Sequence, residues 1–266
     1  MEFTLPPTGF KRLFYDIETS PNIGFFWGSG YRISIPPENI IKERAIICIC
    51  WKWEGQEKVH SATWDNGCDK LVLEAFMNDA LKADELVAHN GDNFDEKWVR
   101  TQCLKFGIPC PPKLNSLDTL KKVRRHFRFN SNKLDYLGKL FFNTGKSPIG
   151  WDDWVQICMH NDLDALEKMV IYCKKDVVLL EDVFHKIQPY IDSNTHAGAQ
   201  EGFGRYSCPS CGNDAPKHHS IRYTKAGMPR HRMICSDTKC GKYFTISHKV
   251  WQDKLEADYL EANAKK

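Results

Sequence analysis

The chain has 266 residues, of which 42% are hydrophobic and 27% are charged, and its formal net charge is +3. This length and apolar content suit one large and one small domain with a buried core. No stretch approaches the roughly 18 uninterrupted apolar residues of a membrane span, and the first residues lack a signal peptide's basic start and apolar core, so we expect a cytoplasmic protein.

The first predicted strand covers residues 13–17, an apolar run that carries Asp16 and is followed by Glu18. Side chains at positions i and i+2 of a strand share one face, so both carboxylates can reach the same metal ions. A single pair of this kind is more often solvated than catalytic. A segment rich in glycine, proline and aromatic residues follows at 21–37.

The next predicted elements are strands at 45–53 and 58–64, a helix at 71–81, a strand at 85–89 and a helix at 96–105. This order predicts an α/β fold with a mixed sheet flanked by helices. Asn90, Phe94 and Asp95 lie where the last of these strands turns into a helix. By themselves they are equally typical of a loop in which Asp92 or Asn93 caps the helix.

A long helix is predicted at 162–187, in which Tyr172 and Asp176 lie four residues apart and therefore on one face. A tyrosine hydroxyl would stand beside a carboxylate there, although an ordinary helix face has the same spacing. Upstream, a basic run is typical of a solvated helix face and also of a surface that follows a nucleic-acid backbone. Its members are Lys121, Lys122, Arg124, Arg125, His126 and Arg128.

Together these segments resemble the DEDD (DnaQ-like) superfamily of 3′-to-5′ exonucleases, in the subgroup with tyrosine in the third motif (DEDDy). The resemblance covers roughly residues 11–187. The motifs are matched by Asp16-Ile17-Glu18-Thr19, by His89-Asn90 with Phe94-Asp95, and by Tyr172-Cys173-Lys174-Lys175-Asp176. Residues 118–120 and 131–138 also resemble intervening segments of that family. The resemblance implies a ribonuclease H-like fold.

The chemistry explains why such a family spreads carboxylates over three segments. Phosphodiester hydrolysis needs an activated water, a stabilised leaving oxygen and neutralised phosphoryl charge, and two divalent cations about 4 Å apart supply all three. Hard cations such as Mg²⁺ or Mn²⁺ take oxygen ligands, so the protein contributes a cluster of Asp and Glu.

The resemblance also implies a role for each residue. Asp16 would bridge both metal ions, Glu18 and Asp176 would hold the ion that binds the attacking water, and Asp95 would hold the second ion largely through water. Tyr172 would orient that water or help to deprotonate it. A related subgroup has a histidine five residues before the last aspartate, where this chain has Ile171. His89 is therefore expected to be a packed residue.

Of the eleven cysteines, seven lie in apolar or helical stretches and are expected to be reduced core residues. They are Cys48, Cys50, Cys68, Cys103, Cys110, Cys158 and Cys173. The other four form two close pairs separated by 23 residues, Cys208 with Cys211 and Cys235 with Cys240. This spacing predicts one structural Zn²⁺ in a zinc ribbon rather than a redox pair. His218, His219 and His231 lie between the pairs and either replace one thiolate or, as we expect, lie on the ribbon surface.

The predicted ribbon is basic. Residues 205–250 contain nine Lys or Arg against two Asp or Glu. Cations interleave with aromatic residues, a mixture that neutralises phosphates and stacks bases; the candidate nucleic-acid contacts are Arg222, Tyr223, Lys225, Arg230, Arg232 and Tyr243. Alternatively the charge only offsets the thiolates, or the ribbon docks a protein. Phe25, Phe26 and Trp27 in the 21–37 segment either stack on terminal bases or pack that loop over the sheet.

The sequence thus predicts a DEDDy exonuclease domain at 1–193, a flexible linker at 194–204, a zinc-ribbon module at 205–250 and a helix at 251–266. The expected activity is metal-dependent 3′-to-5′ hydrolysis of single-stranded DNA to nucleoside 5′-monophosphates. The alternatives are an exoribonuclease and a catalytically silent nucleic-acid-binding adaptor. A separate polymerase or replication protein is a candidate partner, and the size suits a compact bacterial or viral protein.

Overall fold

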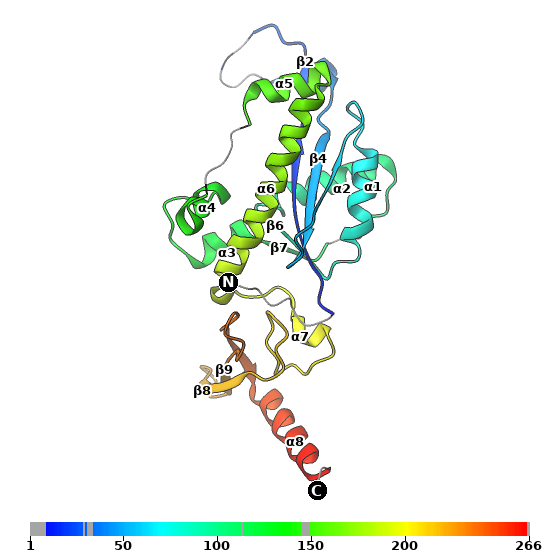
Figure 1. Ribbon diagram of the computed structural model, residues 1–266. Helices are drawn as coiled ribbons and strands as arrows, with labels where there is room; N and C mark the ends of the chain where they lie inside the picture. The colour runs from blue at the N-terminus through cyan, green and yellow to red at the C-terminus, as the bar shows by residue number, and fades with distance from the viewer. Residues whose placement is uncertain (1–8, 29, 31–33, 113, 145–148, 265–266) are drawn as a thin grey trace.

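Figure 1 shows the computed structural model, which describes residues 9–28, 30, 34–112, 114–144 and 149–264. The first eight residues of the predicted nuclease domain, parts of the 21–37 segment and the last two residues of the predicted terminal helix lie outside this range. No helix of the described part is long and apolar enough to cross a membrane.

A mixed five-stranded sheet forms the centre of the large domain. In spatial order its strands are β5 (Val59–Thr63), β4 (Ile46–Trp53), β1 (Arg12–Thr19), β6 (Glu85–Ala88) and β7 (Ser116–Asp118). β1 pairs antiparallel with β4 and parallel with β6. The predicted α/β fold with a mixed, ribonuclease H-like sheet is therefore confirmed.

Helices cover both faces of this sheet (Figure 1). They are α1 (Lys70–Ala80) and α2 (Asp95–Phe106) on one face, and α3 (Thr119–His126), α4 (Leu134–Phe142), α5 (Trp151–His160) and α6 (Leu163–Ile187) on the other. Alternation along β1 sends Leu13, Tyr15 and Ile17 into the α1–α2 core and Phe14 into the α6 core. By the same alternation, Asp16 and Glu18 share the α6 side of the strand.

The 25-residue helix α6 begins where the Asp162 carboxylate accepts a hydrogen bond from the Ala165 backbone amide at 2.9 Å. Its buried stripe, spaced at three and four residues, packs on β1 and β4. An ion pair between Lys52 of β4 and Glu181 of α6, both buried, fixes the helix against the sheet. The predicted third motif is thus carried by a rigid element.

The smaller part of the chain follows the nuclease-like body. Strands β8 (Lys217–Tyr223), β9 (Pro229–Ile234) and β10 (Tyr243–Ser247) form an antiparallel sheet in the order β10-β9-β8. The last helix, α8 (His248–Ala264), begins three residues before the predicted boundary at 251 and extends away from the rest of the molecule (Figure 1).

The segment predicted as a flexible linker contains a short helix, α7 (Ala197–Gln200), that packs on the cysteine-rich module. Ala197 is fully buried and its amide donates to the Pro209 carbonyl at 3.0 Å. Gly198 lies so close to this module that an added Cβ would be 2.1 Å from Ser207 Oγ. The segment is therefore docked along part of its length, while the domain boundaries themselves stay a prediction.

A buried lysine joins the large domain to the cysteine-rich module. The ammonium of Lys242, two residues after Cys240, donates to the Ile191 carbonyl at 2.6 Å and to Ser193 Oγ at 3.0 Å. Those acceptors lie just after η2 (Gln188–Tyr190), the short 3₁₀ helix that continues α6.

Three further short elements, β2 (Ile23–Gly24), η1 (Pro37–Asn39) and β3 (Ile40–Lys42), follow β1.

Candidate active site and metal centre

The four predicted carboxylates meet around Asp16. Burial, and then the negative charges of Asp95, Glu18 and Asp176, raise the pKa of Asp16 well above its ordinary value. α6 touches the strand at this point, where the Cys173 thiol donates to the Asp16 carbonyl at 3.4 Å. Three segments that are far apart in sequence, β1, α2 and α6, therefore bring like charges together in a half-buried place.

Asp95 is the most enclosed of the four, with 2% of its surface exposed. Its pKa is raised to about 7, chiefly by burial, although hydrogen bonds from its own backbone amide and that of Ile17 oppose the shift. Its Oδ1 atom is buried and has no hydrogen-bond partner among the described residues. An orphaned carboxylate oxygen beside three other acidic groups fits hard divalent cations and their bound water.

Two neighbouring residues of the second motif hold this corner in shape. Asn90 adopts a left-handed conformation with φ 75°, and its amide donates to Asp118 Oδ1 at 3.0 Å. His89 lies half-buried, with Nε2 at 2.9 Å from the Asn132 carbonyl and Nδ1 at 2.9 Å from Thr119 Oγ1. The His89 ring thus joins separate segments, in line with the packed histidine that the sequence predicts.

Tyr172 and Asp176 line an open cavity of about 480 Å³ along α6. Lys174 and Lys175 also line it. Of the four predicted metal-binding carboxylates, Asp176 is the one that lines this cavity, and 8% of its surface is exposed. A phosphate that entered here would meet ammonium groups beside the carboxylates.

Three buried thiols lie beside Asp16 and Glu18, a grouping that the sequence analysis did not predict. Cys48 and Cys50 of β4 are the cross-strand partners of Glu18 and Asp16, and Cys173 comes from α6. Their sulfur atoms all lie within 4.8 Å of one another and all three residues are fully buried.

The expectation that seven cysteines are core residues holds for these three and for Cys103 and Cys158, which are buried. Cys110 is half-buried. The expectation is wrong for Cys68, which is exposed, because it lies in a tight turn where its backbone pairs with that of Asp65.

The second cluster contains the four cysteines that the sequence assigns to zinc. The sulfur atoms of Cys208 and Cys240 are 3.8 Å apart, and those of Cys211 and Cys235 are 3.5 Å apart. A tetrahedral zinc ion with bonds of about 2.3 Å to sulfur places its ligands about 3.8 Å apart, so the geometry fits this ion. Hydrogen bonds from the neighbouring thiols, with Cys211 the largest contributor, lower the pKa of the Cys208 thiol.

The three histidines of this module do not join the thiol group. His231 Nδ1 lies 3.1 Å from His218 Nε2, and His231 Nε2 lies 2.9 Å from His248 Nδ1. The prediction that these histidines lie on the surface is wrong for His231, which is 2% exposed, because the first turn of α8 covers it and Trp251 stacks on its ring.

Four of the candidate nucleic-acid contacts of the module lie on one face of its sheet, Arg222, Arg230, Arg232 and Tyr243, whereas Tyr223 follows Arg222 and lies on the other face. Arg222 of β8 lies directly opposite Arg230 of β9, and Arg232 lies two residues further along the same face. Like charges opposite each other on a sheet destabilise it unless an anion is bound. Tyr223 and Tyr243 are exposed, as is Lys225 in the turn between the strands.

The aromatic residues at 25–27 and the basic run at 121–128 are the other candidate nucleic-acid surfaces, and they differ in how exposed they are. Phe25, Phe26 and Trp27 have 76%, 57% and 104% of their surfaces exposed, so packing of these rings over the sheet is ruled out. In the basic run, Lys122 is buried and donates to the Asp192 carbonyl at 2.7 Å, and His126 also contacts Asp192. These two residues of the run therefore tie α3 to the end of the large domain.

The comparisons with known proteins agree with this architecture. A family model of the RNase H superfamily matches residues 42–188, more than half of the chain. The chain belongs to the RNase H superfamily. Among curated proteins, none matches the chain.

A solved structure of the family B DNA polymerase from the hyperthermophilic archaeon Pyrobaculum calidifontis is similar, with a TM-score of 0.54 and 15% identity. The match covers 84% of this chain and 32% of the polymerase, so the chain spans about a third of that protein's length. At this identity the similarity concerns the fold. Superfamily membership together with the carboxylate cluster supports a nuclease, a class of hydrolase that uses divalent metal ions.

Proposed function

We propose that this nuclease is a 3′-to-5′ exonuclease of the DEDDy type that acts on single-stranded DNA and releases nucleoside 5′-monophosphates. The observation that carries the proposal is that Glu18, Asp95 and Asp176 lie close enough to Asp16 for their charges to raise its pKa, with an unpaired buried oxygen on Asp95. This cluster has no evident structural purpose, because mutual repulsion of buried carboxylates destabilises the fold.

These four residues would hold two Mg²⁺ or Mn²⁺ ions. When bound, the ions supply an activated water, stabilise the leaving oxygen and neutralise phosphoryl charge. Tyr172 lines the cavity next to Asp176, where its hydroxyl can accept or donate a hydrogen bond and orient the attacking water. Lys174 and Lys175 attract the phosphate backbone at the same opening.

Two surfaces supply a path for the strand. The exposed rings of Phe25, Phe26 and Trp27 follow β1 and offer flat faces to unpaired bases. The arginine face of the zinc-ribbon module, formed by Arg222, Arg230 and Arg232, lies beyond the other end of the large domain from β2 (Figure 1) and offers cations to phosphates outside the carboxylate site. This arrangement favours a flexible single strand, because bases within a duplex are not free to stack on protein rings.

The test is a time course on 5′-labelled single-stranded DNA and on RNA of the same sequence, with Mg²⁺ or Mn²⁺, resolved on denaturing gels. We expect a ladder that shortens from the 3′ end and stops at a 3′-terminal phosphorothioate block. Asp16→Ala should abolish the ladder while its circular dichroism spectrum stays unchanged, and Tyr172→Phe should lower kcat by roughly 100-fold with little change in strand affinity.

Substantial cleavage by purified Asp16→Ala protein would contradict the two-metal assignment. Shortening of RNA alone would replace DNA by RNA as the substrate, and products cut internally would exclude an exonuclease. Tight binding without metal-dependent cleavage of either polymer would favour the adaptor instead.

A further inference from the structure

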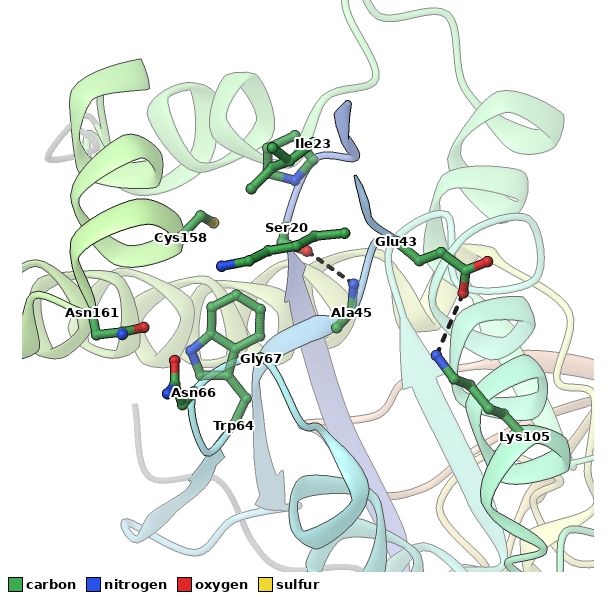
Figure 2. A pocket seen from close by; sticks show the side chains of 12 residues that line it. Ser20, Ile23, Glu43, Ala45, Trp64, Asn66, Gly67, Lys105, Cys158 and Asn161 are labelled. Atoms are coloured by element: carbon green, nitrogen blue, oxygen red, sulfur yellow. Dashed lines mark hydrogen bonds and ion pairs between the residues drawn. The ribbon is translucent and has the colours of Figure 1, made fainter. Parts of the chain in front are cut away.

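A second cavity, of about 360 Å³, opens where β1 ends (Figure 2). Its walls come from Ser20 after β1, Lys42 of β3, Trp64 and Asn66 after β5, and Cys158 and Asn161 at the end of α5. It shares no lining residue with the cavity of Tyr172 and Asp176. A strand rises about 3.3 Å per residue, so Ser20 lies about 7 Å from Glu18, within reach of one nucleotide.

Hydrogen bonds fix the walls of this cavity. The Ala45 amide donates to Ser20 Oγ at 2.9 Å, which closes the wall between β1 and β4. The Trp154 indole donates to the Thr19 carbonyl at 3.1 Å and so holds α5 against the end of β1. The cavity is therefore formed before any ligand binds, and its volume falls in the range of small-molecule sites.

The lining combines three kinds of chemistry. The half-buried ring of Trp64 supplies a flat apolar surface, and Figure 2 shows the carboxamides of Asn66 and Asn161 toward one side of it. Each carboxamide offers both a donor and an acceptor. Lys42 adds an ammonium group, whereas the ammonium of Lys105 is paired with Glu43 at 3.5 Å.

We propose that this cavity binds one nucleotide of the strand whose end lies at the carboxylates, with its base against Trp64, the base edge on Asn66 and Asn161, and its phosphate toward Lys42. The proposal rests on the proposed exonuclease function and adds a base-contacting position to it. The side chains of Lys42, Asn66 and Asn161 are exposed at the rim of the cavity. An apolar ligand would make no hydrogen bond or ion pair with them, and a simple carboxylate would leave the Trp64 ring uncovered. A nucleotide uses all three.

The backbone makes a clean test possible. Asn66 and Asn161 have φ values of 49° and 52°, which glycine adopts without strain, so Asn66→Gly with Asn161→Gly removes both carboxamides and keeps both turns. Asn143→Gly is the matched control, because Asn143 has φ 53° and ends α4 away from the cavity.

The full-length protein would be titrated with a labelled single-stranded oligothymidylate in buffer without divalent ions, and with a set of oligonucleotides that each lack one base near the 3′ end. We expect the double variant to weaken binding roughly 10-fold, with no effect of Asn143→Gly. In the wild type, one abasic position should weaken binding by a similar factor. That positional penalty should vanish in the double variant.

The proposal would be overturned if the double variant bound the oligonucleotide as tightly as the wild type does. It would also be overturned if removing one base near the 3′ end weakened binding to the double variant as much as it weakens binding to the wild type. Binding is measured without turnover, so the two proposals fail separately. A positional penalty in a protein that cleaves nothing supports the nucleotide cavity and refutes the exonuclease. Cleavage without any positional penalty keeps the exonuclease and refutes the cavity.

Discussion

Replacing Asp95 by asparagine should make the metal-free protein more stable. The side chain is 2% exposed, one oxygen has no hydrogen-bond partner among the described residues, and its carboxyl pKa is raised to about 7. Asparagine has the same shape without the charge. Its carbonyl oxygen can still accept hydrogen bonds from the backbone amides of residue 95 and of Ile17.

The sign and size follow from the two pKa values. The carboxyl ionises near pH 3.8 in the unfolded chain but only near pH 7 in the folded protein. Below about pH 4 the carboxyl group is protonated in both the folded and the unfolded protein, and the free energy of unfolding is not reduced. Between about pH 4 and pH 7 the free energy of unfolding of the wild type falls as pH rises, by a total on the order of 4 kcal/mol above pH 7. Asp95→Asn escapes this loss, so we expect it to be 1 to 4 kcal/mol more stable at about pH 8 and equal to the wild type near pH 4.

Urea unfolding from pH 4 to 8.5 measures the difference, in buffer freed of divalent ions but without a chelator that would strip zinc from the thiols. Mn²⁺ should then raise the free energy of unfolding of the wild type far more than that of the variant. The bound cation neutralises the ionised carboxylates, as protons do at low pH. Asp253→Asn, an exposed change in α8, is the control and should alter neither quantity. A variant less stable than the wild type at pH 8, or stabilised equally by Mn²⁺, would refute the reasoning.

Three further outcomes are expected. Native mass spectrometry should find one zinc ion per chain, lost when Cys208 and Cys211 are both replaced by serine; its absence from the native protein would contradict the zinc ribbon. Lys242→Met should lower the free energy of unfolding by about 1 to 3 kcal/mol and speed proteolysis at 194–204, because it removes buried hydrogen bonds between the two parts; unchanged proteolysis would show that they are held otherwise. Arg222→Ala with Arg230→Ala should reduce the slope of log affinity against log salt for single-stranded DNA by about 1.4, and an unchanged slope would exclude this face from the contact.

The amino-acid sequence was sufficient for features that depend on local periodicity. Alternation along residues 13–18 puts Asp16 and Glu18 on one side of a strand, and the four-residue spacing puts Tyr172 and Asp176 on one face of a helix. The spacing of the four cysteines near the C-terminus likewise predicts a cluster, which the fold assembles. Each of these patterns lies within one element or one pair of turns, where chain geometry alone dictates which side chains are neighbours.

Other features depend on the packing of elements that are far apart in sequence. The unpaired oxygen of Asp95 exists because α2 begins against β1, and the three thiols meet because α6 crosses β4 beneath Asp16. Residues 194–204 read as a flexible linker by composition, yet Ala197 is buried because the module folds back onto it.

The same holds for the cavity around Trp64, whose walls come from five separate segments. The sequence by itself determined which residues can do metal and thiol chemistry. Only the tertiary structure decided which of these residues are buried, which repel one another and which line a cavity. Burial and electrostatic repulsion arise from contacts between elements far apart in sequence, and no local sequence pattern records such contacts.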